Sequence, residues 1–109
     1  MKLLALFGLL ACASGETVIK SIRKDSSGMY GFTIHTKAKR RHFTADVVEN
    51  SQADKVGIPE GWKIVEVNGQ AVDGLMNEEV AEMMTAQDDA ILLLSDDTVL
   101  YNGRVIHQN

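Results

Sequence analysis

The sequence predicts a small α+β domain that is mostly β: a partly open antiparallel barrel or sandwich of five to six strands, capped by two helices. Short segments with alternating apolar residues outnumber helical ones, and glycine- or asparagine-containing turns separate them. The chain has 109 residues, which is the length of one domain and too short for a doubly wound sheet.

The composition favours a globular chain and excludes some classes of function. It is 45% hydrophobic and 24% charged, which is typical of a folded domain rather than a disordered segment. A formal net charge of -4 argues against a general nucleic-acid binder. Cys12 is the only cysteine, so no disulfide within the chain holds the fold together.

The first fifteen residues, "MKLLALFGLLACASG", differ from the rest. A basic residue, an apolar run and then small residues follow the layout of a secretory signal peptide, which predicts a secreted protein. An apolar N-terminal arm, a mis-assigned start in an intracellular protein, or a lipid-carrying Cys12 are the alternatives. We therefore expect a leader over residues 1–15, a domain over 16–97 and a tail over 98–109.

Three strands are expected in the first half of the domain, over residues 16–24, 30–36 and 43–49. Apolar residues alternate with polar ones in these segments, with a slip in the first. A polar turn over 25–28 separates the first two strands. The segment 37–42, "KAKRRH", reads as a charged connector that is too polar to bury.

A short helix of one or two turns is expected over residues 50–57. Asn50 and Ser51 are good helix caps, and Gly57 is a good helix stop. The segment therefore predicts the first of the two capping helices.

The second half alternates strands with the longer helix. Residues 61–69 read as a strand that ends in an Asn-Gly turn and leads into a short strand. Residues 75–87 carry apolar side chains at helical spacing, with glutamates opposite. The continuous apolar run over 90–95 predicts a buried strand, and a second Asn-Gly in the tail predicts a hairpin.

The chain resembles the PDZ domain family over about residues 17–97, and three segments carry the resemblance. "MYGF" (29–32) is similar to the Gly-Leu-Gly-Phe loop that binds carboxylates in that family. "VVENSQADKVGIPEGWKIVEVNGQAV" (47–72) and "GLMNEEVAEMM" (74–84) are similar to the family's central and helical motifs. Their order is that of animal-type PDZ domains.

The resemblance implies that the domain captures the C-terminal carboxylate of a partner peptide. The N–H groups of Tyr30, Gly31 and Phe32 would form an anion nest, whose geometry glycine permits. The peptide would continue as a strand added beside the second strand of the domain. Arg23 or Lys24 would hold a bridging water near the carboxylate, and the sequence does not choose between them.

The resemblance also implies a pocket for the last side chain of the ligand. Tyr30, Phe32 and Ile34 would line it, and Ala81 and Met84 on the long helix would form the far wall. A small alanine and an adaptable methionine predict a roomy pocket for a terminal Leu, Ile or Phe. The alternative is that these residues are ordinary core.

Two further residues are expected to border the groove. Asn77 stands where the family usually has a histidine that selects the third residue from the ligand's end. Its donor and acceptor fit Ser, Thr or an acidic residue there, or its side chain is instead spent as the helix N-cap. His35 lies on the same strand as Ile34 and is also expected at the groove.

A basic loop, Lys37, Lys39, Arg40 and Arg41, would lie beside the groove in this fold. It would attract acidic residues upstream in the ligand or an anionic membrane surface. A solvated loop is the simpler explanation.

Three hypotheses for the function remain. The first is a monomeric module that binds C-terminal peptides of other proteins. The second is an interaction domain whose groove is filled by an internal segment such as the tail, and the third is a lipid-headgroup binder with weak membrane contact. The three histidines show no metal-ligand spacing and no nucleophile motif occurs, so we expect no catalysis, metal or cofactor.

Overall fold

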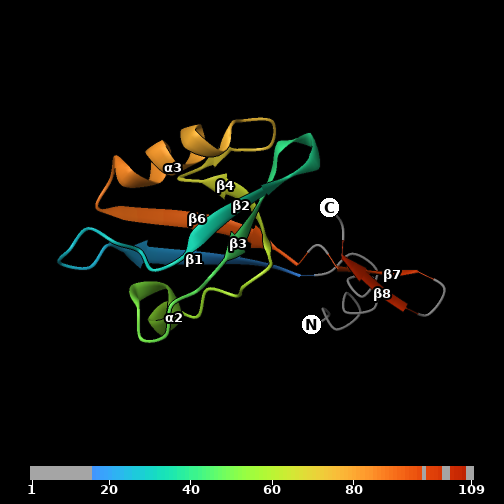
Figure 1. The fold of residues 1–109 in the computed structure, drawn as a ribbon, viewed down its shortest axis with the longest axis horizontal. Helices are drawn as coiled ribbons and strands as arrows, with labels where there is room; N and C mark the ends of the chain where they lie inside the picture. The colour runs from blue at the N-terminus through green and yellow to red at the C-terminus, as the bar shows by residue number, and fades with distance from the viewer. Residues whose placement is uncertain (1–15, 97, 102–103, 108–109) are drawn as a thin grey trace, which may run out of the picture.

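The computed structural model describes residues 16–96, 98–101 and 104–107 (Figure 1). The expected leader over 1–15 and the expected turn at Asn102-Gly103 lie outside the described residues. No helix in the described part of the chain is long and apolar enough to cross a membrane.

Six strands form one antiparallel sheet, which confirms the mostly β prediction. They are β1 (Thr17–Arg23), β2 (Thr33–Lys37), β3 (Arg41–Ala45), β4 (Lys63–Val67), β5 (Gln70–Ala71) and β6 (Asp89–Ser95). The order across the sheet is β1-β6-β4-β3-β2, with β5 paired to β4. β1 and β2 stand at the two ends of this order, so the sheet does not close and β2 has an outer edge.

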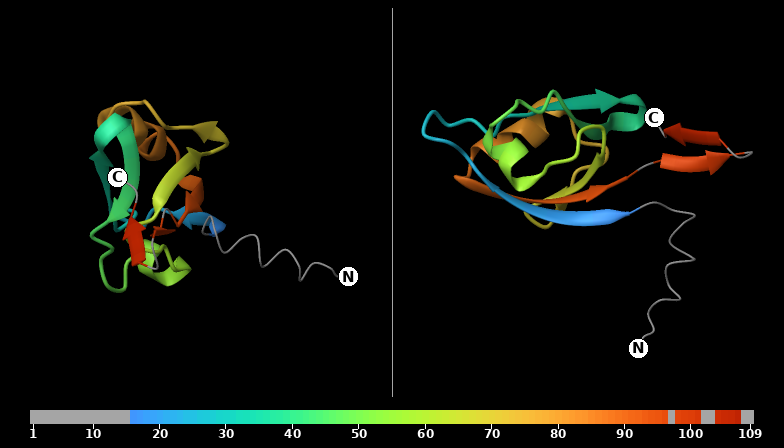
Figure 2. Two further views of the ribbon diagram at one scale, coloured as in Figure 1. Left: turned by 90° about the vertical axis from the view of Figure 1, so that its right-hand side faces the viewer. Right: turned by 90° about the horizontal axis from the view of Figure 1, so that it is seen from below.

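Two helices cap the sheet, as predicted. α2 (Gln52–Val56) packs near β1, and α3 (Asn77–Thr85) lies along β2 and β4 (Figures 1 and 2). Ser51 caps α2 by accepting a hydrogen bond from the Asp54 N–H, and Gly57 ends the helix at a φ of 77°. Both capping predictions for this helix are confirmed.

The helix α3 is shorter than the predicted span of 75–87. Its N-cap is Met76, whose N–H donates to the Glu79 carboxylate at 2.7 Å. The alternative that Asn77 is the N-cap is therefore wrong: Asn77 is the first residue of the helix, and its side chain is bonded elsewhere.

The predicted connector over 37–42 is also wrong at both ends. Lys37 belongs to β2 and Arg41 opposes it at the start of β3, so only the short 3-10 turn η1 (Ala38–Arg40) connects the strands. His42 is fully buried; its Nδ1 bonds the Thr36 hydroxyl across the strand pair at 2.8 Å, whereas its Nε2 has no partner among the described residues. A paired polar side chain is far less costly to bury than an unpaired one.

The core lies between the sheet and the helices. Its fully buried side chains come from all parts of the domain, and the largest apolar ones are Ile22, Ile64, Val67, Val72, Val80, Leu92 and Leu94. Residues of β1 alternate as expected, since Ile22 is buried whereas Ile19 is 70% exposed. Val80 and Met84 carry α3 onto this core and so fix the helix beside β2.

The tail forms two strands, β7 (Thr98–Tyr101) and β8 (Arg104–His107), which pair antiparallel with each other. Among the described residues these two strands make a separate sheet, and neither pairs with β2.

Candidate functional site

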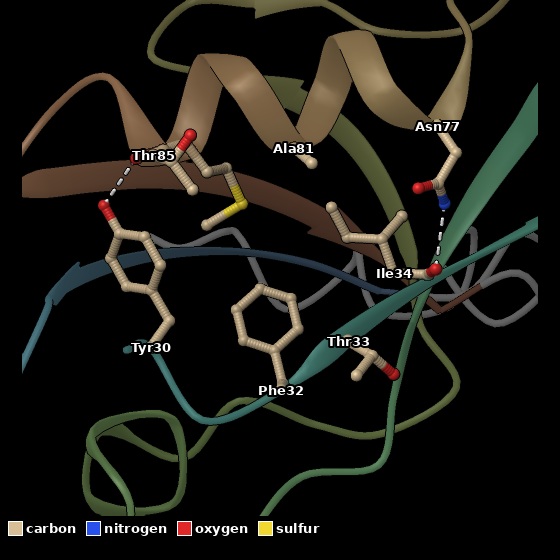
Figure 3. Close-up of a pocket in the computed structure, with 8 residues that line it drawn as sticks. Tyr30, Phe32, Thr33, Ile34, Asn77, Ala81 and Thr85 are labelled. Carbon is tan, nitrogen blue, oxygen red and sulfur yellow. Dashed lines mark hydrogen bonds between the residues drawn. The ribbon is translucent and has the colours of Figure 1, made fainter. Parts of the chain in front are cut away.

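A cavity of about 260 Å³ opens between β2 and α3 (Figure 3). Its lining residues are Tyr30, Phe32, Thr33, Ile34, Asn77, Ala81, Met84 and Thr85. The five residues expected in the ligand pocket from the sequence are all among them. The lining is largely apolar, and α3 forms the wall opposite the outer edge of β2.

The loop that leads into this cavity is shaped by one carboxylate. Asp25 accepts hydrogen bonds from the Ser27 N–H at 2.8 Å, the Ser27 hydroxyl at 2.8 Å and the Met29 N–H at 3.0 Å. These bonds, the one from the Met29 N–H foremost, lower the pKa of Asp25. The carboxylate therefore remains charged and holds the turn that precedes Tyr30.

Three consecutive carbonyl groups of this loop all accept hydrogen bonds from the backbone. The Met29 carbonyl accepts from the Asp25 N–H at 2.9 Å, that of Tyr30 from the Ala53 N–H at 2.9 Å, and that of Gly31 from the Val48 N–H at 2.8 Å. In a trans peptide the N–H points opposite to the C=O of the same unit. Each of the three N–H groups that follow these carbonyls therefore points away from the donor that its own carbonyl binds.

Those three N–H groups belong to Tyr30, Gly31 and Phe32. Within the described part of the chain, none of them donates a hydrogen bond. Adjacent, unpaired backbone donors are an anion-binding arrangement, and they lie next to the apolar cavity that the same residues line. The site can therefore receive a group that is negatively charged at one end and apolar beside it.

Gly31 is required at this position for two reasons. Its φ is +96°, a conformation that residues with a side chain rarely adopt. A Cβ here would also stand well inside 3.0 Å of the Ser51 side chain. The loop is thus pressed against the start of α2 with no room for another atom.

Tyr30 connects the loop to the end of α3. Its hydroxyl donates a hydrogen bond that is shared between the Met84 carbonyl, at 2.9 Å, and the Gln87 carbonyl, at 3.1 Å. Burial, followed by the nearby charges of Asp89 and Asp88, raises the pKa of the phenol. The neutral phenol therefore fixes the spacing between the loop and the helix at this end of the cavity.

The two basic candidates near the loop differ in position. The Arg23 guanidinium pairs with Asp89 at 3.2 Å on the exposed surface. The Lys24 ammonium donates to the Thr85 carbonyl at 2.6 Å and lies 5.9 Å from the centre of the Tyr30 ring. Lys24 therefore contacts two residues that line the cavity, Thr85 and Tyr30, although it is not itself among the lining residues.

Asn77 marks the other end of the cavity. Its amide nitrogen donates to the Ile34 carbonyl at 3.0 Å and to the Thr36 hydroxyl oxygen at 2.9 Å (Figure 3). The first bond shows that the Ile34 carbonyl points toward α3 and away from β3. This carbonyl is therefore an acceptor on the outer edge of β2.

The structure does not bring His35 into the cavity. His35 points to the opposite face of β2, where it lines a different shallow pocket with Phe43 and Glu60. The alternation of side chains along a strand explains this, because its neighbour Ile34 faces the groove.

The basic loop is close to the start of α3. Lys37 lies over the Phe43 ring at 4.7 Å, Arg40 donates to the Gly74 carbonyl at 3.3 Å, and Arg41 donates to the Ala38 carbonyl at 3.3 Å. Lys39 is exposed, with a φ of 63°. Much of this positive charge is thus engaged in holding the turn.

Sequence reasoning missed four residues of the site region. Thr33 and Thr85 line the cavity, and Thr36 and His42 support Asn77 from behind. Thr36 lies two residues after Ile34, so the strand period alone would have placed it on the groove side. No comparable signal marks His42, which stands among exposed cations in the sequence.

The model of the PDZ domain family matches residues 19–94, and the chain belongs to this family of protein-interaction modules. Syntenin-2 of Mus musculus is 35% identical over 108 residues, covering 89% of this chain and 35% of the relative. The Na(+)/H(+) exchange regulatory cofactor NHE-RF2 of Oryctolagus cuniculus is 38% identical over 77 residues, covering 69% and 24%. The chain thus spans about a third or less of the length of these curated relatives.

Proposed function

We propose that this domain binds the C-terminal carboxylate of partner proteins and holds the adjoining peptide as a strand against β2. The observation that carries the proposal is the set of three unpaired N–H groups at Tyr30, Gly31 and Phe32, beside an apolar cavity. A hydrogen bond to a charged group contributes about 1.5 to 3 kcal/mol, so three such donors favour a carboxylate strongly.

The remaining contacts follow from the same geometry. The last side chain of the peptide enters the cavity between Phe32, Ile34 and Ala81, which suits Leu, Ile or Phe. Lys24, which bonds the carbonyl of the lining residue Thr85, adds a positive charge near the carboxylate. The outer edge of β2 offers backbone groups to the peptide, which is β-strand addition.

A peptide pair tests the proposal. Peptides that end in a free Leu, Ile or Phe carboxylate are titrated against the protein, together with C-terminally amidated copies of the same sequences. We expect the amide to weaken binding at least about tenfold, the equivalent of one lost charge-assisted bond. Equal binding of acid and amide would reject carboxylate capture.

For the cellular role, we propose a scaffold module rather than an enzyme. Support comes from the relatives: one is named a regulatory cofactor, and both proteins are longer than this chain. We also propose that residues 1–15 are a leader and that the protein is secreted. N-terminal sequencing of the protein from its native cells checks them, since an intact Met1 excludes cleavage.

A second candidate function is weak binding to anionic lipid headgroups. It is favoured by the gathering of Lys37, Lys39, Arg40 and Arg41 around a single turn. Co-sedimentation with anionic liposomes tests it, using Lys39→Ala, whose side chain is exposed, as the first variant. Binding that is independent of liposome charge would exclude this function.

A further inference from the structure

The groove between β2 and α3 is bridged by the side chain of Asn77. The carboxamide extends from the first residue of α3 and reaches the opposite wall, where its nitrogen is 3.0 Å from the Ile34 oxygen (Figure 3). Any peptide that pairs with β2 at Ile34 must occupy this gap, because an added strand lies only about 4.8 Å from its neighbour. The carboxamide therefore stands where the peptide backbone would be.

The position of the bridge between Asn77 and Ile34 determines how many peptide residues can bind without breaking it. A carboxylate held at Gly31 and Phe32 places the last residue of a peptide beside Phe32. Ile34 is two residues further along β2, and an antiparallel peptide advances by the same step, so Ile34 faces the third residue from the peptide's end. Only the last two residues fit without disturbing Asn77.

The bridge is fixed from the core rather than by chance contact at the surface. Both hydrogens of the Asn77 amide are used, one on the Ile34 carbonyl and one on the Thr36 hydroxyl oxygen. The Thr36 hydroxyl in turn lies 2.8 Å from Nδ1 of the buried His42 ring. The Thr36 hydroxyl therefore donates its own proton to His42 Nδ1. The ring proton of His42 is then on Nε2, which has no partner among the described residues.

We propose that Asn77 is a gate that divides the groove and limits how much affinity a peptide gains from residues beyond its last two; this rests on the proposed function. Two terminal residues bind with the gate closed. A longer peptide that pairs with β2 must first break the bond between Asn77 and Ile34, which offsets the backbone bonds that the third residue makes. Binding in the wild-type protein therefore gains little from peptide length.

A ladder of acetylated peptides tests the gate. The peptides have two, three, four and six residues, with Leu at the free C-terminus and Ala elsewhere, so that no ligand side chain can hydrogen-bond residue 77. Binding is followed by NMR titration. We expect a flat length profile in the wild type and, in Asn77→Ala, a gain of about 3- to 10-fold from three residues onward, with the two-residue peptide unchanged.

Three further variants test whether the length profile depends on the Asn77 bridge. Asn77→Asp cannot donate to the Ile34 carbonyl, so its length profile should also lose the flat shape of the wild type, while its negative charge changes the affinity for every peptide of the ladder. Thr36→Val removes one anchor of the bridge and should give a smaller gain, with its folding checked by thermal unfolding because Thr36 also supports His42. Glu78→Ala, at the next and exposed residue of α3, should keep the flat wild-type profile.

Parallel length profiles in the wild type and Asn77→Ala would overturn the gate. So would a gain that appears equally for the two-residue peptide. Amidated copies of the ladder separate this failure from failure of the proposed function: equal binding of amides rejects carboxylate capture, whereas acid-dependent binding with parallel profiles rejects only the gate.

Discussion

The backbone of Gly31 lies so close to the side chain of Ser51 that a Cβ on Gly31 would fall well inside 3.0 Å of it. Ser51 is also the N-cap of α2, and its hydroxyl reaches the Gly31 carbonyl at 3.4 Å. The loop that offers the three N–H groups and the start of α2 therefore form one packed unit. Disturbing this contact should move the anion-binding donors.

Gly31→Ala should reduce the free energy of unfolding by about 2 kcal/mol or more. The substitution adds strain at a positive φ and forces Ser51 away. Gly28→Ala is the matched control, because Gly28 also has a positive φ, +83°, yet no atom lies near its missing Cβ. Urea denaturation measures both variants; equal losses would mean that the contact with Ser51 has no effect of its own.

Tyr30→Phe should destabilise the domain by about 0.5 to 1.5 kcal/mol, the usual value of one hydrogen bond. The hydroxyl donates to the Met84 and Gln87 carbonyls at the end of α3, and both carbonyls would lose this bond, although that of Met84 keeps its bonds from backbone N–H groups. Thermal unfolding measures the effect. A variant as stable as the wild type would show that the bond is dispensable.

The stability of the wild-type domain should also fall at high pH because of Tyr30. Its folded-state pKa is raised above the ordinary value of 10.0, first by burial and then by Asp89 and Asp88. The folded state therefore holds this proton more tightly, and stability is lost as the pH rises above 10 and through the raised pKa. Tyr30→Phe should lose less stability over this range, and equal losses would contradict the assignment.

The turn before the loop should persist in acid because of Asp25. Its pKa is lowered from the ordinary value of 3.8, foremost by the bond from the Met29 N–H. The contribution of the carboxylate is thus complete above pH 3.8 and is lost as the pH falls through the lower folded-state pKa. The chemical shift of the Met29 N–H reports this titration, and a midpoint at or above 3.8 would contradict it.

Ala81→Leu should narrow the ligand pocket. The added side chain enters the cavity opposite Ile34, so peptides ending in Phe or Leu should lose affinity about tenfold or more, and those ending in Ala much less. Glu82→Leu introduces the same residue on an exposed face of α3 and should leave the ranking unchanged. A common loss for all peptides would instead indicate damage to the helix.

The sequence predicted the elements best where pattern and packing agree. Ser51 and Gly57 marked the ends of α2 because capping is a local property. The prediction of a solvated connector over 37–42 was wrong because charge along the sequence does not exclude burial: His42 is buried, with its Nδ1 bonded to Thr36 on the neighbouring strand. Such a pairing depends on the register of two strands, which local sequence does not contain.

The same reasoning applies to the candidate site. Tyr30, Phe32 and Ile34 could be placed in the cavity from the strand period and the resemblance. The role of Asn77 could not be chosen, since a side chain that reaches across to another element has no local signature. The hydrogen bond from Asn77 to the Ile34 carbonyl, which only the folded structure shows, distinguishes a contact with β2 from a helix cap.

An unpaired strand edge such as that of β2 is a hazard for any soluble protein, because two copies can join there and begin to aggregate. Asn77 occupies an acceptor on this edge, and α3 packs against β2 beside it. Both features should lower the tendency of two copies of the free domain to join through this edge.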